Sequence, residues 1–257
     1  MMNITKKLAL RHLKQNKSRS VLTVLGITIS VVMLTVIFTC ATSFAHYYGE
    51  RAINTNGNWH FFVKTDYESA KKGICASLEK SGLEYFDLYL LHQACGDYFS
   101  AWRAMEDAYQ EGILKAIGVS NFYPNILTNF CEIVKVKPVV NQVELHPYYT
   151  QEKALETMKY YNVVPEAWAP LGGGRYNPFE DEMLKGIAAK YNKSVGQVIL
   201  RWNVQRGVVV IPKSTHVERI KENIDVFDFE LNEEEMKQIS SLDMGYSGSR
   251  AKHFEPD

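Results

Sequence analysis

Short apolar segments alternate with longer amphipathic ones from about residue 66 onward, and this alternation limits the possible folds more than any other feature. The amphipathic segments separate the apolar ones at a spacing typical of strand–helix units, whose strands pair in parallel. Several of the apolar segments are nearly continuous, as expected for strands buried on both faces. The predicted strands are Tyr85–His92, Lys115–Ser120, Val139–Leu145, Val163–Ala169 and Gly207–Pro212. The predicted helices are Tyr67–Ser81, Tyr98–Glu111, Pro124–Glu132, Gln151–Tyr161, Val195–Gln205 and Glu233–Leu242.

The number of these units bounds the architecture. A closed (β/α)₈ barrel needs eight strand–helix units and typically about 250 residues. Five units are predicted here, within the last 190 residues or so of the chain. We therefore expect an α/β fold, either an open parallel sheet or an incomplete (β/α)₈ TIM-type barrel with about five βα units.

The N-terminal segment has a different character. The run from Val21 to Cys40 contains no charged residue and no proline. Twenty helical residues span about 30 Å, the thickness of the hydrocarbon core of a bilayer. We expect one transmembrane helix over about 21–45, and hence two parts, 1–63 and 66–257. A buried core helix, or a signal peptide cleaved near Ser43–Ala45, is the alternative.

Charge separates the same two parts. Residues 1–49 contain six Lys and Arg and no Asp or Glu, although the whole chain has 29 of each class. A basic leader next to a membrane helix stays in the cytoplasm, so a single span with a cytoplasmic N-terminus is expected. The balanced total gives no reason to expect a nucleic-acid partner. The four cysteines lack metal-ligand spacing, so no metal site is expected.

Polar residues stand where the predicted strands end, which is where parallel α/β folds place their chemistry. His92 ends the first strand, Ser120 and Asn121 the second, and Trp168 the fourth, while Gln142 lies within the third. Each has an ordinary structural interpretation, such as a buried histidine or a turn asparagine.

The fifth predicted strand leads into a polar stretch. Lys213, Ser214 and Thr215 precede a helix that carries Arg219. A cation and hydroxyls at a helix N-terminus suit a phosphate group, although the same residues also make an ordinary helix cap.

Taken together, several segments closely resemble the aldo/keto reductases, from about Asp66 to the C-terminus. They are DLYLLHQ, AWRAMEDAYQEGILKAIGVSNF, PVVNQVELHPYY, PEAWAPLGGGR and the long stretch from LRWNVQRGVVVIPKSTHVERIKENIDVFDF onward. The resemblance implies an NADPH-dependent reductase of an aldehyde or ketone on a (β/α)₈ barrel, with NADP(H) as cofactor and a small-molecule carbonyl substrate.

The resemblance also implies roles for individual residues. His92 matches the catalytic histidine that orients the substrate carbonyl. Trp168 matches the aromatic residue that stacks on the nicotinamide ring. The other implied cofactor residues are Ser120, Asn121 and Gln142 for the carboxamide, Pro170, Leu171 and Gly172 for the pyrophosphate loop, Lys213, Ser214, Thr215 and Arg219 for the 2′-phosphate, and Glu222 and Asn223 for the adenine.

The sequence departs from the family at the other catalytic positions. The family's catalytic Asp and Tyr belong to a GxRxIDTAxxYxNE-type motif, which this chain lacks, and Trp59 stands where the catalytic Lys is expected. We expect impaired reduction, because the developing alkoxide needs a proton donor. The alternative is a non-catalytic NADPH-binding remnant.

Residues 1–63 resemble the start of a permease subunit of ABC-type exporters, on the stretch ALRHLKQNKSRSVLTVLGITIS. This resemblance implies a fused gene, association with the membrane, and a membrane-transport fragment as a further alternative. NADPH-linked chemistry would instead require the cytoplasm, which conflicts with a chain that leaves it after residue 45.

Overall fold

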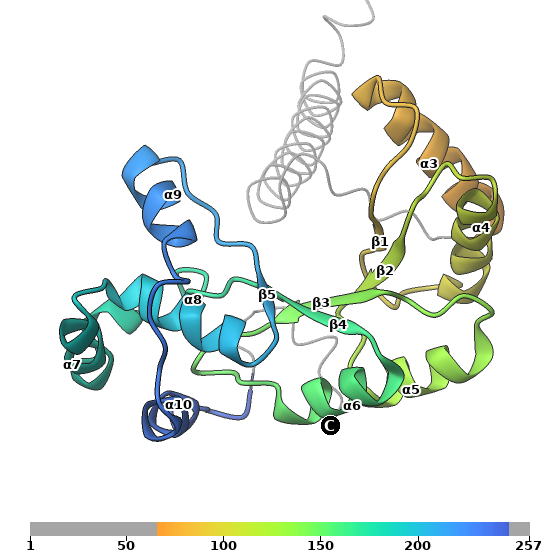
Figure 1. Ribbon diagram of the computed structural model, residues 1–257. Helices are drawn as coiled ribbons and strands as arrows, with labels where there is room; N and C mark the ends of the chain where they lie inside the picture. Colours follow the sequence, from red (N-terminus) through yellow and green to blue (C-terminus); the bar gives the residue numbers. More distant parts are fainter. Residues whose placement is uncertain (1–65, 247–257) are drawn as a thin grey trace, which may run out of the picture. The chain divides into compact units, whose positions relative to one another are not determined.

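The computed structural model describes residues 66–246, which form α/β structure around one parallel sheet (Figure 1). They lie within the second of two units into which the chain divides, Val63–Asp257. The expected span at 21–45 and the permease-like stretch at 1–63 fall outside the described residues. Among the helices that are described, none combines the length and the apolar character needed to cross a membrane.

The sheet has five parallel strands whose spatial order follows the chain. They are β1 (Tyr89–Leu91), β2 (Ile117–Ser120), β3 (Val140–Glu144), β4 (Val164–Trp168) and β5 (Val209–Val210). The predicted parallel sheet and its five βα units are therefore confirmed. Because every pair of neighbouring strands is parallel, the carboxyl ends of all five lie on the same side of the sheet.

The described helices are α3 (Tyr67–Ser81), α4 (Tyr98–Gln110), α5 (Pro124–Ile133), α6 (Glu152–Tyr161), α7 (Glu182–Tyr191), α8 (Val195–Gln205), α9 (Val217–Ile224) and α10 (Glu233–Ser240), with a short 3₁₀ turn at Pro178–Glu180. Helices α4, α6 and α8 pack against the strands, and the remaining helices lie farther out around the arc of strands (Figure 1). Five helices begin at a side-chain cap, in which the oxygen of Asp66, Asp97, Asp181, Ser194 or Asn232 accepts a hydrogen bond from a first-turn backbone N–H.

Three details differ from the sequence-based expectation. The sequence-based expectation did not include α7, whose buried residues are Leu184, Ile187 and Ala188. The expected strand at Gly207–Pro212 shrinks to Val209–Val210, because β5 pairs on one side only within the described sheet. The strand expected from Tyr85 begins at Tyr89, after a single bridge between Phe86 and Leu114.

A continuous hydrophobic core lies between the sheet and its helices. Its largest side chains include Trp102 of α4, Phe122, Phe130 of α5 and Trp202 of α8, all fully buried. The rings of Trp102 and Phe130 meet edge to face with centroids 5.1 Å apart, and Trp102 Nε1 donates to the Val136 carbonyl at 3.0 Å. This polar contact satisfies the one donor that a buried tryptophan must place.

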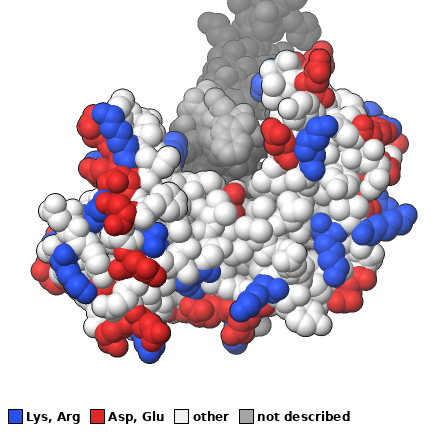
Figure 2. All heavy atoms as spheres, in the orientation of Figure 1, with Lys and Arg blue, Asp and Glu red and all other residues white. Residues whose placement is uncertain are grey.

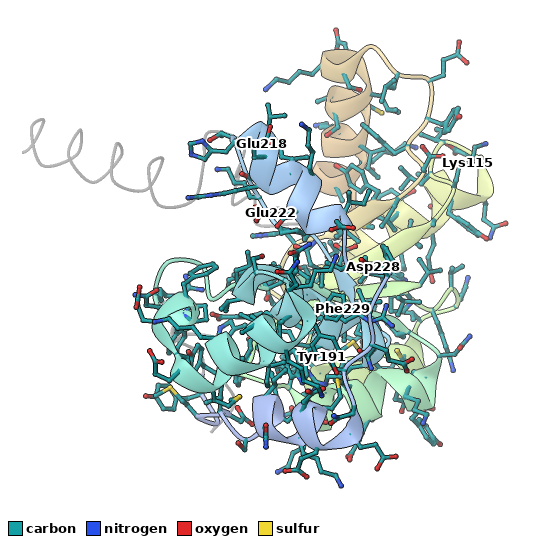
Figure 3. All side chains as sticks on the ribbon, turned by 60° about the vertical axis from the view of Figure 1, so that its left-hand side comes forward. Lys115, Tyr191, Glu218, Glu222, Asp228 and Phe229 are labelled. Atoms are coloured by element: carbon teal, nitrogen blue, oxygen red, sulfur yellow. The ribbon has the colours of Figure 1, made fainter. Side chains whose placement is uncertain are left out.

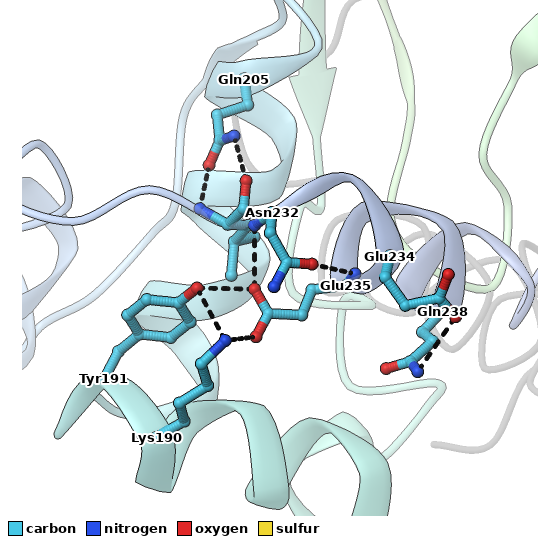
Figure 4. Close-up of polar contacts among 8 residues, drawn as sticks. Lys190, Tyr191, Gln205, Asn232, Glu234, Glu235 and Gln238 are labelled. Carbon is cyan, nitrogen blue, oxygen red and sulfur yellow. Dashed lines mark hydrogen bonds and ion pairs between the residues drawn. The ribbon is translucent and has the colours of Figure 1, made fainter.

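The last helix of the described residues, α10, is held in place by a polar cluster (Figure 4). Asn232 Oδ1 accepts from Glu235 N, and Glu235 Oε2 accepts from Asn232 N, both at 2.9 Å. Lys190 and Tyr191 of α7 each donate to the Glu235 carboxylate at 2.6 Å. Burial opposes ionisation of Glu235, but these donors outweigh it and hold the pKa of its carboxyl below the ordinary value.

Replacing Asn232 with alanine should lower the free energy of unfolding by about 1 kcal/mol, because the first turn of α10 loses its side-chain acceptor. Urea denaturation of the purified full-length chain, followed by circular dichroism, measures this. Asn232→Ser keeps an acceptor and serves as the control. A change equally large in the serine variant would show that the cap is not the cause.

Candidate functional site

Five of the predicted site residues meet at the carboxyl ends of β1 to β4. His92 follows β1, Ser120 ends β2 and Asn121 follows it, Gln142 lies in the middle of β3, and Trp168 ends β4. The parallel pairing sets Ser120 beside Gln142 in register, so that the ends of neighbouring strands lie level. The structure thus brings these five residues together toward the carboxyl-terminal side of the sheet.

Asn121 is the centre of this group. Its Oδ1 accepts from Trp168 Nε1 at 2.9 Å, and its Nδ2 donates to Ser120 Oγ at 3.1 Å and to the His92 carbonyl at 3.4 Å. Asn121 is buried and has a φ of 59°, a left-handed conformation that asparagine tolerates better than most residues. One side chain therefore links the ends of three strands.

Ser120 and Gln142 form further side-chain hydrogen bonds. Ser120 Oγ donates to the Gln142 carbonyl at 2.9 Å, while Gln142 Nε2 donates to Glu166 Oε1 at 2.6 Å. A flat amide ligand placed here would meet hydroxyl and carboxamide groups already held in fixed directions. Sequence reasoning did not single out Glu166, which lies two residues before Trp168 on β4.

The loop that follows β4 carries Pro170, Leu171 and Gly172. The backbone N–H of Gly172 donates to the Ala169 carbonyl at 2.9 Å, which closes a tight turn. Gly172, Gly173 and Gly174 all have positive φ, at 83°, 57° and 74°. Glycine adopts this region without the steric cost that a side chain would add, so the GGG run shapes this loop.

A buried carboxylate, that of Glu144, is in contact with the segment that follows these glycines. Glu144, at the end of β3, is fully buried, and its Oε1 lies 2.7 Å from Arg175 Nη2 and 3.2 Å from His146 Nε2. Arg175 also places its guanidinium carbon 5.5 Å from the centre of the Trp168 ring. Sequence reasoning did not single out Arg175, although its position directly after three glycines was a signal that the sequence offered.

The residues expected to bind the 2′-phosphate and adenine lie after β5. Lys213, Thr215, Arg219 and Glu222 are exposed, while Ser214 and Asn223 are half-buried. Ser214 Oγ accepts from the His216 backbone N–H at 3.1 Å, just before α9 begins. Figure 3 shows Glu218 and Glu222 along α9. The structure thus places these six residues on the loop after β5 and on α9.

Helix α9 carries charged side chains of both signs. On the face shown in Figure 2, charged side chains of both signs cluster over α9, whereas the middle of that face is largely uncharged. Lys221 of α9 is paired with Glu218 at 3.2 Å. Neither Lys213 nor Arg219 forms an ion pair with another of the described residues, so both cations are available to an anionic ligand. This arrangement fits a phosphate-bearing cofactor.

Comparison with known proteins agrees with this geometry. The aldo/keto reductase family model matches residues 52–244, so the chain belongs to the aldo/keto reductase family. The match begins upstream of Asp66, where we expected the resemblance to start, and it overlaps part of the permease-like stretch. These matches give no support to an exporter permease at residues 1–63.

Particular relatives are similar along much of the chain. Glyoxal reductase of Bacillus subtilis is 47% identical over 177 residues, which make up 68% of this chain and 63% of that protein. Methylglyoxal reductase DkgA of Escherichia coli is 38% identical over 183 residues, or 70% of this chain and 66% of that protein. The chain spans less than two thirds of the length of several curated relatives it matches, at 62–63%.

Solved structures share the fold. A Bombyx mori aldo-keto reductase in complex with NADP has a TM-score of 0.71 at 32% identity, covering 79% of this chain and 75% of that one. An aldo-keto reductase from a deep-sea metagenome library of the Medee basin has a TM-score of 0.68 at 41% identity, covering 71% and 69%.

Proposed function

We propose that this chain binds NADP(H) across the carboxyl ends of its strands and acts on a small aldehyde or ketone. The observation that carries the proposal is the convergence of His92, Asn121, Gln142 and Trp168 at one end of the sheet, joined by hydrogen bonds through Asn121. Glyoxal and methylglyoxal reductases among the relatives support a small carbonyl substrate. The NADP complex of a structural neighbour supports the cofactor.

The proposed binding mode divides the cofactor between two groups of residues. Lys213 and Arg219 hold the 2′-phosphate through charge-assisted hydrogen bonds, with the hydroxyls of Ser214 and Thr215 beside it. Glu222 and Asn223 on α9 contact the adenine. Pro170, Leu171 and Gly172 cover the pyrophosphate with the loop after β4.

The nicotinamide end is held at the strand ends. Trp168 stacks on the ring, and Ser120, Asn121 and Gln142 bond its carboxamide. When bound, NADPH supplies the hydride. His92 orients the substrate carbonyl by hydrogen bonding to its oxygen.

We further propose that turnover by this chain is slow. His92 is the one residue of the family's four catalytic positions that the sequence supplies in register. A positioned general acid contributes about 10²–10⁴-fold to such a reaction. With water or His92 as proton donor, we expect a rate lower than that of a complete reductase by a factor in that range.

A fluorescence titration of the purified full-length chain with NADPH, in mild detergent, tests the binding proposal. We expect saturable binding at micromolar concentration, and weaker binding of NADH because it lacks the 2′-phosphate. No saturation up to millimolar NADPH would refute the proposed site. Turnover with methylglyoxal then separates a slow reductase from a protein that binds NADPH without reducing a carbonyl.

A further inference from the structure

Arg175 joins three parts of the molecule that its position in the sequence does not connect. Its guanidinium donates to the buried Glu144 carboxylate of β3 at 2.7 Å and lies over the ring of Trp168 at the end of β4. Its side chain folds back along its own loop, so that a Cβ placed on Gly173 would lie 3.3 Å from Arg175 Nη2. The glycine at 173 therefore leaves room for this fold-back.

Glu144 gives Arg175 a strong anchor. The Glu144 side chain is 1% exposed, whereas that of Arg175 is 32% exposed. A buried carboxylate is costly unless charged or polar donors surround it, and breaking such a pair is destabilising. Here His146 lies 3.2 Å from the same oxygen, and Gln151 Nε2 donates to the Glu144 backbone carbonyl at 3.0 Å. Glu144 is therefore a fixed point to which the loop can be attached.

Trp168 is held from two directions. Its Nε1 donates to Asn121, which fixes one edge of the indole, and Arg175 lies over the ring. Arginine stacks on aromatic faces and forms directional bonds to carboxylates at the same time, which lysine does not match. Loss of Arg175 would leave Trp168 with the Asn121 bond and remove the contact between its ring and the loop.

The loop itself needs such an anchor. Three successive glycines give residues 172–174 a large conformational freedom that must be given up when the loop is ordered. The next fixed point along the chain is Tyr176, whose ring stacks on Tyr148 with centroids 4.9 Å apart. Arg175 stands between the glycines and this stack.

We propose that Arg175, anchored on Glu144, is a positioning residue that holds the Gly172–Gly174 loop and the Trp168 ring in their cofactor-binding arrangement. The inference rests on the proposed NADP(H) site, since the loop and Trp168 matter to function only through it. Arg175 acts through these two elements rather than on the reacting atoms.

Limited trypsin digestion tests the anchor without any cofactor. Trypsin cleaves after Arg175 only when the loop opens, so the initial rate of this cleavage, followed by mass spectrometry, reports loop opening. With Glu144→Gln we expect cleavage after Arg175 to accelerate about tenfold, while cleavage after the exposed Lys221 stays unchanged. Equal rates in the wild type and the variant would overturn the proposal.

A second variant tests the anchor in case Glu144→Gln does not fold. Arg175→Lys keeps a trypsin site at a partly exposed position, and it should also accelerate cleavage after residue 175, since it loses the arginine's directional bond and stacking. An unchanged rate in this variant overturns the proposal in the same way.

Cofactor affinity gives the functional readout. We expect Arg175→Gln to weaken NADPH binding about tenfold and Arg175→Lys to restore part of it. Lys185→Gln is the matched control, because Lys185 is a cation of α7 paired with Glu180 and Glu182 on the surface. Equal affinity of wild type and Arg175→Gln would overturn the proposal. If the wild type itself binds no NADPH, the proposed function fails, and the digestion result then decides the anchor alone.

Discussion

The double variant Lys213→Ala/Arg219→Ala should bind NADPH about 100-fold more weakly than the wild type. Each cation is exposed and without an ion-pair partner among the described residues, so each is free to contact the 2′-phosphate. A hydrogen bond to a charged group contributes about 1.5–3 kcal/mol, and exposure to solvent places these two near the lower end. Fluorescence titration gives the dissociation constants directly.

Two controls make this result specific. NADH lacks the 2′-phosphate, so its affinity should hardly change in the double variant. Lys221→Ala removes a cation from the same helix, α9, but Lys221 is paired with Glu218 and is two residues from Arg219, on another face. If Lys221→Ala weakened NADPH binding as much as the double variant, general attraction by α9 rather than a phosphate site would be the cause.

Replacing Trp102 with alanine should lower the free energy of unfolding by about 3–5 kcal/mol. Trp102 is fully buried, packs against Phe130 and donates its Nε1 hydrogen bond to the Val136 carbonyl. The substitution leaves a large cavity between α4 and α5 and removes the donor. Urea denaturation followed by far-ultraviolet circular dichroism measures the change, since tryptophan fluorescence would itself be altered.

Matched variants separate packing from hydrogen bonding. Trp102→Phe keeps most of the ring volume but loses the donor, so it should cost less than half as much as Trp102→Ala. Tyr160→Ala removes an aromatic side chain that is 80% exposed and should be nearly neutral. Equal destabilisation by Trp102→Ala and Tyr160→Ala would show that α4 does not pack as described.

The strand–helix pattern allowed most of the described fold to be predicted. Strands buried on both faces, such as β2 and β3, have continuous apolar sequences that local periodicity detects. Strand β5 is shorter than its apolar run because a strand extends only where a neighbour pairs with it. Periodicity reports burial, whereas pairing depends on residues far away in the chain.

The candidate site, too, could be predicted from the sequence only in part. The grouping of His92, Ser120, Asn121 and Trp168 at strand ends was expected from the sequence, because parallel strands bring their carboxyl ends together. The bonds among them did not follow, since Asn121 reaches Trp168 across 47 residues of chain. The contact of Arg175 with Glu144 spans 31 residues and was likewise invisible to local patterns.

The amino-acid sequence by itself determined the α/β class, the five parallel units and the family. These properties depend on local periodicity and on motifs of neighbouring residues. Only the tertiary structure decided which side chains bond to one another, that Glu144 is buried beneath the glycine loop, and that Arg175 lies over Trp168. Such contacts depend on how separate strands register in the sheet and how the loops return over them, because folding brings distant residues within hydrogen-bonding distance.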